Sequence, residues 1–298
     1  MTMRTGILIL ASLAMGGAVI GFVPRQTPTT TKDQAAGLAR KFLKLAGLPD
    51  PKQPPSVKAM PPSSVFRDRW EVVFSGEYRL TVLHNDGMVG SFQNQRRIEE
   101  QFKGKQDRSV RRFTSANQAA SHLHALATKF GLRPQAKRTK LEYVNDGDPK
   151  KTDSNRAGRI HVQYRTKPFG YAFFPPEMGN GMGLTIDPVD GALVSFAQSW
   201  DIKIESHTLG VSKTRAIAKA EAVFRPYRKK HRSFHTTADE PVGKVELGYV
   251  LPNPAYGSKH PNPTTEKLAR LAYIVYFGVE TVWIDAATGK LLGGQSFA

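Results

Sequence analysis

The stretch Leu184-Thr-Ile-Asp-Pro-Val-Asp-Gly-Ala-Leu-Val-Ser-Phe196 predicts the architecture of the chain. Its two apolar arms flank Asp190-Gly191, a dipeptide that favours a tight turn because glycine adopts positive φ at little cost. The same pattern occurs at Leu80 to Phe92 and at Val282 to Gly294. All three copies have glycine at the eighth position: Gly87, Gly191 and Gly289. Self-similarity at a fixed offset is typical of a repeated unit.

A predicted helix precedes each hairpin. Thr31-Lys-Asp-Gln34 and Ser115-Ala-Asn-Gln118 have the spacing of a capping box, and Ser212 can cap a third helix. Apolar residues at helical spacing follow the caps. These are Ala35, Leu38, Ala39, Phe42, Leu45 and Ala46, then Leu123, Leu126, Ala127 and Phe130, then Ala216, Ile217, Ala220, Val223 and Phe224.

Strand patterns such as Trp70-Glu-Val-Val-Phe74 lie between each helix and its hairpin. The pattern predicts an α+β fold of three tandem repeats, each an amphipathic helix packed on an antiparallel sheet of about four strands. We place the repeats at 27–107, 108–207 and 208–298. Because a unit of this size has a marginal core, we expect neighbouring units to pack on one another.

Residues 1–26 are interpreted as an export segment. Gly6 to Val23 carry no charge, Arg4 precedes them and Arg25 follows. The run is long for a signal peptide and just long enough for a membrane span. Cleaved signal peptide and retained anchor both stay open, with cleavage slightly favoured. We expect an exported protein that is periplasmic, extracellular or anchored facing outward.

The composition is strongly basic and free of cysteine. The 298 residues have a formal net charge of +18, which attracts polyanions such as acidic lipid or wall polymer. The basic residues are scattered, and no known nucleic-acid-binding motif is present, so we expect no specific nucleic-acid partner. Without cysteine, disulfides, thiol nucleophiles and cysteine-ligated metals are excluded.

No residue pattern indicates catalysis, a metal or a cofactor. His122 and His124 point to different faces of the predicted helix. His231 and His235 have metal-ligand spacing but lie among Arg228, Lys229, Lys230 and Arg232, and no Glu of an H-E-x-x-H motif accompanies them. The carboxylates Asp187, Asp190 and Asp285 are interpreted as turn residues that accept backbone hydrogen bonds. We therefore expect a protein that is not an enzyme.

With these elements in place, the chain resembles tandem PepSY-type domains, particularly the YcdB/YcdC-type repeat group. Trp70-Glu-Val-Val-Phe74 and the hairpins Asp187 to Gly191 and Asp285 to Gly289 carry the resemblance. The first copy departs from it, with Leu83 at the usual Asp position. The resemblance implies an exported or membrane-tethered protein that is not a catalyst. It further implies one that binds or restrains a peptidase or another cell-envelope protein.

The middle copy carries an aromatic insertion from Lys167 to Met178. If its side chains are exposed, they would form a hydrophobic patch that can bind a partner protein. The candidate partner-binding residues are Phe169, Tyr171, Phe173, Phe174 and Met178. Alternatively, the loop folds back and fills the junction between the second and third units. The alternative function is an adhesion module that binds acidic wall polymer or a membrane surface through its basic charge.

Overall fold

The computed structural model describes residues 30–61, 68–84, 87–102, 111–145, 158–176, 179–231, 235–260 and 268–296. Segment 1–26, the predicted export segment, lies outside them. The helices are α1 (Lys32–Leu45), α2 (Gln95–Phe102), α3 (Ala116–Lys129) and α4 (Lys213–Lys230), with 3-10 turns η1 (Pro168–Gly170) and η3 (Ala255–Gly257). The strands are β1 (Ser56–Met60), β2 (Arg69–Phe74), β3 (Tyr78–Leu83), β4 (Val89–Asn94), β5 (Lys137–Asn145), β6 (Gly158–Arg165), β7 (Gly181–Ile186), β8 (Leu193–Ser199), β9 (Lys203–Ser206), β10 (Val242–Val250), β11 (Leu268–Phe277), β12 (Glu280–Asp285) and β13 (Leu291–Gln295).

The long helices begin where the sequence predicts. At α1 the Thr31 side chain accepts a hydrogen bond from the Gln34 amide, and the Gln34 side chain accepts one from the Thr31 amide. This is the complete capping box. Ser115 caps α3 through the Gln118 amide, but the Gln118 side chain accepts from Thr114 instead, so the predicted second box is incomplete. A serine also caps α4.

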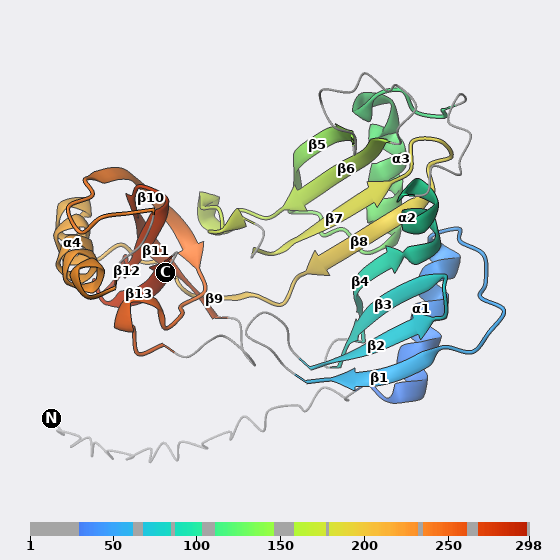
Figure 1. Ribbon diagram of the computed structural model, residues 1–298, viewed down its shortest axis with the longest axis horizontal. Helices are drawn as coiled ribbons and strands as arrows, with labels where there is room; N and C mark the ends of the chain where they lie inside the picture. The colour runs from blue at the N-terminus through green and yellow to red at the C-terminus, as the bar shows by residue number, and fades with distance from the viewer. Residues whose placement is uncertain are drawn as a thin grey trace, which may run out of the picture.

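Eight strands form one antiparallel sheet in the order β1-β2-β3-β4-β8-β7-β6-β5 (Figure 1). Its centre is the pair β4–β8, where Phe92 lies opposite Phe196. Each of these strands is the last of four consecutive strands and would be an unpaired edge if those four stood alone. Pairing them removes both edges, each of which would otherwise leave a row of backbone N–H and C=O groups unpaired.

The prediction of three tandem repeats, each a helix on its own sheet of about four strands, is therefore wrong. The described residues form thirteen strands and four helices, and the first eight strands share one sheet and one core. A strand shows the same alternation of apolar and polar residues whether its outer edge is free or paired. The hydrophobic pattern therefore cannot show that β4 and β8 meet.

The large sheet is covered by helices on one face. α1 packs over β1 to β4, and α3 packs over β5 to β7. Strands β3 and β6 alternate between buried and less buried residues, as expected for a sheet with one covered face. Across the centre of the core, the rings of Phe42 and Phe130 stack with their centroids 4.6 Å apart.

The remaining strands form a five-stranded sheet in the order β10-β11-β12-β13, with β9 parallel to the start of β11. α4 packs on one face, where Phe224 stacks on Phe277 at 4.0 Å between centroids. The other face carries a second apolar cluster around Trp283, which includes Phe174 from the segment after β6. Every residue of β12 is buried. This sheet is thus covered on both faces.

The predicted turn roles of Gly191 and Gly289 are confirmed. Their φ angles are +79° and +71°, a region that side chains rarely adopt. The Gly191 amide donates to the carbonyl of Asp187, and the Gly289 amide donates to the carbonyl of Asp285, each at 2.8 Å. These bonds close the connections from β7 to β8 and from β12 to β13.

Candidate functional site

A gap in the helix layer lies over the β4–β8 junction. The centres of α1 and α3 are four to five strand spacings apart, roughly 20 Å, whereas helices in direct contact are about 8–10 Å apart. The short helix α2 follows the end of β4 and contacts β3 and β8, which fills that end of the gap. The other end, near Met88 and Val89, remains open as a groove.

The floor of this groove is aromatic. The groove has a volume of about 390 Å³, and Phe42 and Phe130 line it from the two helices. Phe196 packs beneath, with its ring centroid 5.1 Å from each of theirs. Leu38 and Leu45 of α1 add aliphatic surface, and 42% of Leu45 is exposed. Phe42 and Phe130 are buried, with 6% and 8% exposure, so the apolar surface open to a ligand comes mainly from Leu38, Leu45 and Met88.

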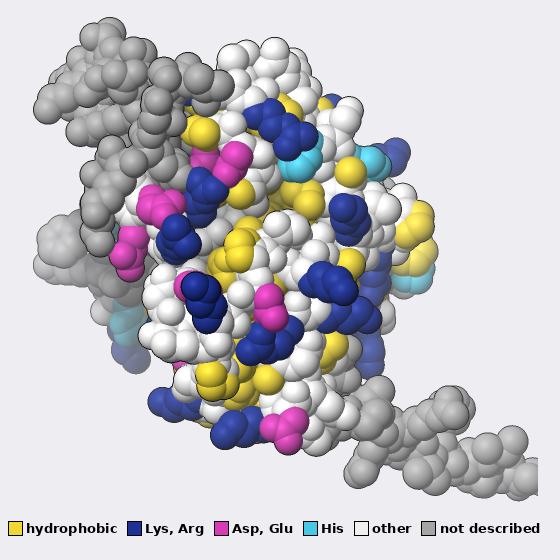
Figure 2. All heavy atoms as spheres, turned by 90° about the vertical axis from the view of Figure 1, so that its right-hand side faces the viewer, with side chains coloured by type: hydrophobic (Ala, Val, Ile, Leu, Met, Phe, Trp, Pro, Cys, Tyr) yellow, Lys and Arg dark blue, Asp and Glu magenta, His cyan; other side chains and the backbone are white. Residues whose placement is uncertain are grey.

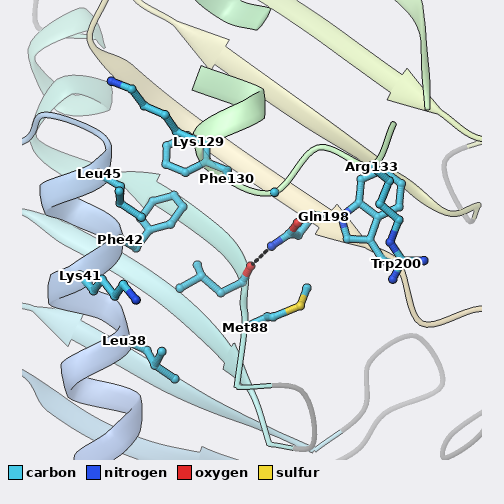
Figure 3. A pocket seen from close by; sticks show the side chains of 12 residues that line it. Leu38, Lys41, Phe42, Leu45, Met88, Lys129, Phe130, Arg133, Gln198 and Trp200 are labelled. Atoms are coloured by element: carbon cyan, nitrogen blue, oxygen red, sulfur yellow. Dashed lines mark hydrogen bonds between the residues drawn. The ribbon is translucent and has the colours of Figure 1, made fainter. Parts of the chain in front are cut away.

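Two hydrogen bonds among the residues that line the groove also secure the sheet junction. The Gln198 amide donates to the Val89 carbonyl at 2.8 Å, across from β8 to β4 (Figure 3). The Trp200 indole N–H donates to the Gln198 side-chain oxygen at 2.8 Å. The Trp200 ring is thereby held in place, and the Arg133 guanidinium lies 5.3 Å from its centre. These bonds tie Trp200 to Gln198 and Gln198 to β4.

Three cations surround the apolar floor. Lys41 of α1, Lys129 of α3 and Arg133 are all exposed, and none has an ion-pair partner among the described residues. No Asp or Glu is found among the described residues that line the groove. Figure 2, which faces the helix layer, shows apolar side chains along the middle of this face with Lys and Arg on both sides and fewer Asp and Glu among them. The local field therefore favours an anionic ligand.

A second hollow continues along α1. It has a volume of about 450 Å³ and lies next to the first, since both are lined by Leu38 and Lys41. It reaches the start of the helix at Thr30 and Gln34. From Gln34 to Leu45 the helix rises by roughly 16 Å at 1.5 Å per residue. The two hollows together follow most of one side of α1.

The sequence prediction did not find this groove. The helical spacing predicts core stripes that contain the lining residues Leu38, Phe42 and Phe130, and it gives no reason to single out Lys41 and Lys129. These residues come from two predicted repeats, and they meet only because β4 pairs with β8. The sequence does show a lysine next to an apolar stripe residue in both helices, Lys41 before Phe42 and Lys129 before Phe130. That these lysines line one groove follows only from the pairing of β4 with β8.

The aromatic insertion is spread over several environments. Phe169, with φ of +51°, is 66% exposed and stacks on His207 at 4.3 Å between centroids. Tyr171 is half-buried, and Phe173 is buried with 6% exposure. The half-buried Phe174 packs edge-on against Trp283, with centroids 6.1 Å apart. The last predicted partner-binding residue, Met178, lies outside the described residues.

Backbone hydrogen bonds attach this insertion to the second sheet. The Tyr249 amide of β10 donates to the Ala172 carbonyl at 2.8 Å, and the Phe174 amide donates to the Tyr249 carbonyl at 2.7 Å. Phe173 thus forms a parallel bridge with Tyr249 on the outer edge of β10. These contacts correspond to the alternative in which the loop fills the junction. Of the predicted patch, Phe169 alone among the described residues is largely exposed.

The histidines singled out in the sequence have separate environments. A ring nitrogen of His122 lies 3.0 Å from the Gly191 carbonyl, and His124 lies beside Tyr164. His231 packs against Tyr227. Within the part of the chain that the structure describes, no three His, Asp or Glu side chains gather as a metal site.

The turn carboxylates accept backbone hydrogen bonds, as predicted. Asp187 accepts from the Val189 amide and Asp190 from the Ala192 amide, each at 2.9 Å. Arg97 of α2 forms ion pairs with both carboxylates, which joins the two strand sets at the far end of the junction. These contacts give both carboxylates a structural role in the turn.

Asp285 holds the third hairpin in the same manner. Its carboxylate accepts from the Thr288 amide at 2.7 Å and pairs with Arg270 at 2.5 Å. Burial acts to raise the pKa of Asp285, but the amide hydrogen bond and the guanidinium outweigh it and hold the pKa below its ordinary value. The carboxylate therefore stays ionised, as a turn residue should.

Comparisons with known proteins leave the family open. No family model matches the sequence, and a search of curated proteins finds no match. One solved structure, an uncharacterized protein from Eubacterium rectale, matches with a TM-score of 0.43 and 12% identity over 92% of this chain and 84% of that one. Among the described residues, no helix is long and apolar enough to cross a membrane.

Proposed function

We propose that this protein is a non-enzymatic, exported binding protein that holds or restrains a peptidase or another cell-envelope protein, with the groove between α1 and α3 as its contact surface. The observation that carries the proposal is an open groove with three exposed cations on its rim, none of which has an ion-pair partner among the described residues. The residues that resemble PepSY-type domains, Trp70 to Phe74 and the Asp187 and Asp285 hairpins, favour the same class of function.

The groove suits protein contact better than catalysis. Its described lining contains no carboxylate, histidine, serine or threonine, so it offers no general base and no nucleophile other than amines. Its aromatic floor and cationic rim instead match the composition of protein interfaces, where buried aromatic anchors are surrounded by polar groups.

Site-specific crosslinking in the producing cell tests this function. A photoactivatable residue replaces Leu45 in the groove or, as a control, Val279, another exposed apolar residue in the turn between β11 and β12. We expect a defined envelope protein to crosslink from position 45 only. That protein, once purified, should bind the chain, and its activity, if it is a peptidase, should fall. Equal crosslinking from both positions would rule the proposal out.

The second candidate function is adhesion to acidic polymer or lipid, which the net charge of +18 favours. Binding through scattered charges falls steeply as salt rises from 50 to several hundred mM, because exposed charges are screened. Docking in an apolar groove depends less on salt. Binding to vesicles with acidic headgroups that disappears at high salt, with no protein crosslinked from position 45, would favour adhesion.

A further inference from the structure

We infer that the groove between α1 and α3 accepts a short amphipathic helix with an acidic flank, contributed by the partner protein. This inference rests on the proposed function and specifies the ligand of the same site. The ligand helix would lie over the β4–β8 junction, with its apolar side on Phe42 and Phe130 and its carboxylates near Lys41, Lys129 and Arg133.

The width of the gap supports a helical ligand. The axes of α1 and α3 are roughly 20 Å apart, twice the separation of helices in contact. Because Phe42 and Phe130 already stack across this gap, a further helix would lie on top of these rings and not at their depth between the helices. Because α2 already occupies one end of this row, the vacant part is short. The two hollows along α1 extend over roughly 16 Å, which corresponds to about eleven residues of helix.

The charges around the groove specify the acidic flank. Lys41 and Lys129 lie on opposite sides of the apolar floor, and Arg133 lies beside Trp200 (Figure 3). With no acidic side chain in the described lining, a neutral or basic helix would leave the three cations without partners near a low-dielectric surface. Carboxylates on the ligand would supply those partners, as in other complexes that bury an amphipathic helix in a groove.

The N-terminal part of this chain is a poor match for the same groove. The described chain begins at Thr30, which lines the second hollow. However, residues 1–29 contain Arg4 and Arg25 and no Asp or Glu. Lys41 would gain no counter-charge from them. Charge complementarity therefore selects an acidic segment from a different protein.

A displayed library of random 14-residue peptides, selected against the full chain, tests the inference. We expect the selected peptides to be acidic and to place apolar residues at i, i+3, i+4 and i+7. Binding of the synthetic peptides is then measured by fluorescence anisotropy. A peptide with the same composition but a scrambled order, which has lost the apolar stripe, should bind at least tenfold more weakly.

Two matched pairs of variants locate the binding. Lys41→Glu with Lys129→Glu reverses two charges at the groove, whereas Lys213→Glu with Arg215→Glu reverses two exposed charges on α4. Both give the chain the same net charge. We expect the groove pair to weaken peptide binding about tenfold and the α4 pair less than twofold. Leu45→Gln should weaken binding about threefold, and Val279→Gln should have no effect.

The outcomes separate this inference from the proposed function. Selected peptides without negative charge or helical periodicity would overturn the inference, as would equal effects of the two charge pairs. A crosslinked envelope protein that binds but is not displaced by the peptides would preserve the function and overturn the inference. Peptides that bind in the groove, with no envelope protein crosslinked from position 45, would preserve the inference and overturn the function.

Discussion

The two sheets differ in how they are covered. The eight-stranded sheet has helices on one face, and its helix layer leaves a groove over the β4–β8 junction. The five-stranded sheet has α4 on one face and the Trp283 cluster on the other. A helix followed by four strands occurs in chain order in both regions. The same local order therefore produces an open surface in one region and a closed core in the other.

The closed region also contains a buried polar network. Arg228 of α4 and Glu280 of β12 form an ion pair in which neither side chain is exposed. The Tyr256 hydroxyl donates to Glu280 at 2.9 Å. The pKa of Tyr256 is raised mainly by its burial and to a smaller extent by this hydrogen bond. Such a network tolerates little rearrangement, since an unpaired buried charge is costly. The small region is thus closed on both faces and contains this network, whereas the large region has the groove for which we propose a binding role.

The largest effect is expected when the buried ion pair is broken. Arg228→Met leaves Glu280 without a counter-charge in the core and should lower the free energy of unfolding by about 3–5 kcal/mol. The matched change in the large region is Arg40→Met, which removes an exposed pair with Asp50 and should cost less than about 1 kcal/mol. Urea denaturation of both variants measures the difference.

A double variant serves as the control for this prediction. Replacing both Arg228 and Glu280 by Met removes the charges together, and most of the lost stability should return, because two apolar side chains can fill the space. If Arg228→Met and Arg40→Met destabilise the protein equally, the small region is no more tightly organised than the large one.

Truncating one aromatic residue in each core should give the next largest effects. Phe224→Ala removes a fully buried ring that stacks on Phe277 and should cost about 4 kcal/mol. Phe130→Ala should cost about 3 kcal/mol, because this ring borders the groove and its neighbours can move into the space. Thermal and urea unfolding test the order of the two variants. A larger loss for Phe130→Ala would argue against a permanently open groove.

The insertion that joins the two regions gives a smaller difference. Phe174→Ala should cost about 2 kcal/mol, because the ring packs on Tyr276 and Trp283. Phe169→Ala should change stability by less than about 0.5 kcal/mol, since that ring is mostly exposed. Hydrogen exchange of the Tyr249 amide, which bonds to Ala172, should speed up in the first variant only. Equal exchange in both would show that the insertion does not hold the regions together.

The smallest effect is expected from the hairpin of the closed region at acidic pH. Because the folded-state pKa of Asp285 is below its ordinary value of 3.8, its contribution to stability is fully present above that pH. It is lost as the pH falls below 3.8 and through the folded-state pKa. In Asp285→Asn this part of the pH dependence should disappear. Unfolding measured between pH 2 and 6 tests it, and an unchanged acid profile would contradict the assignment.

Local features of this fold are readable in the sequence because each depends on residues close together in the chain. Thr31 and Gln34 form their predicted capping box, and Gly191 and Gly289 adopt their predicted positive φ. The role of the Asp187 and Asp285 carboxylates in their turns was likewise predictable. Caps and turns use hydrogen bonds between residues two to four positions apart, so a single sequence contains all the partners.

The arrangement of the strands and the candidate site were not readable. α2 and β9 were not predicted, and neither was the pairing of Phe92 with Phe196 that merges the first eight strands. The sequence allows Phe173 to be either exposed or packed, because an aromatic loop has the same sequence in both cases. The groove exists because β4 pairs with β8, which brings α1 and the end of α3 to one surface.

The sequence by itself thus determined the three long helices, the hairpin turns, the basic charge and the absence of cysteine. Only the tertiary structure decided that β4 pairs with β8, that Phe173 and Phe174 pack on the second sheet, and that Lys41 and Lys129 line one groove. The physical reason is that strands pair through backbone N–H and C=O groups, which are the same in almost every residue. Which edges meet is settled by the backbone hydrogen bonds and apolar area that the whole fold gains, not by the residues of any one strand.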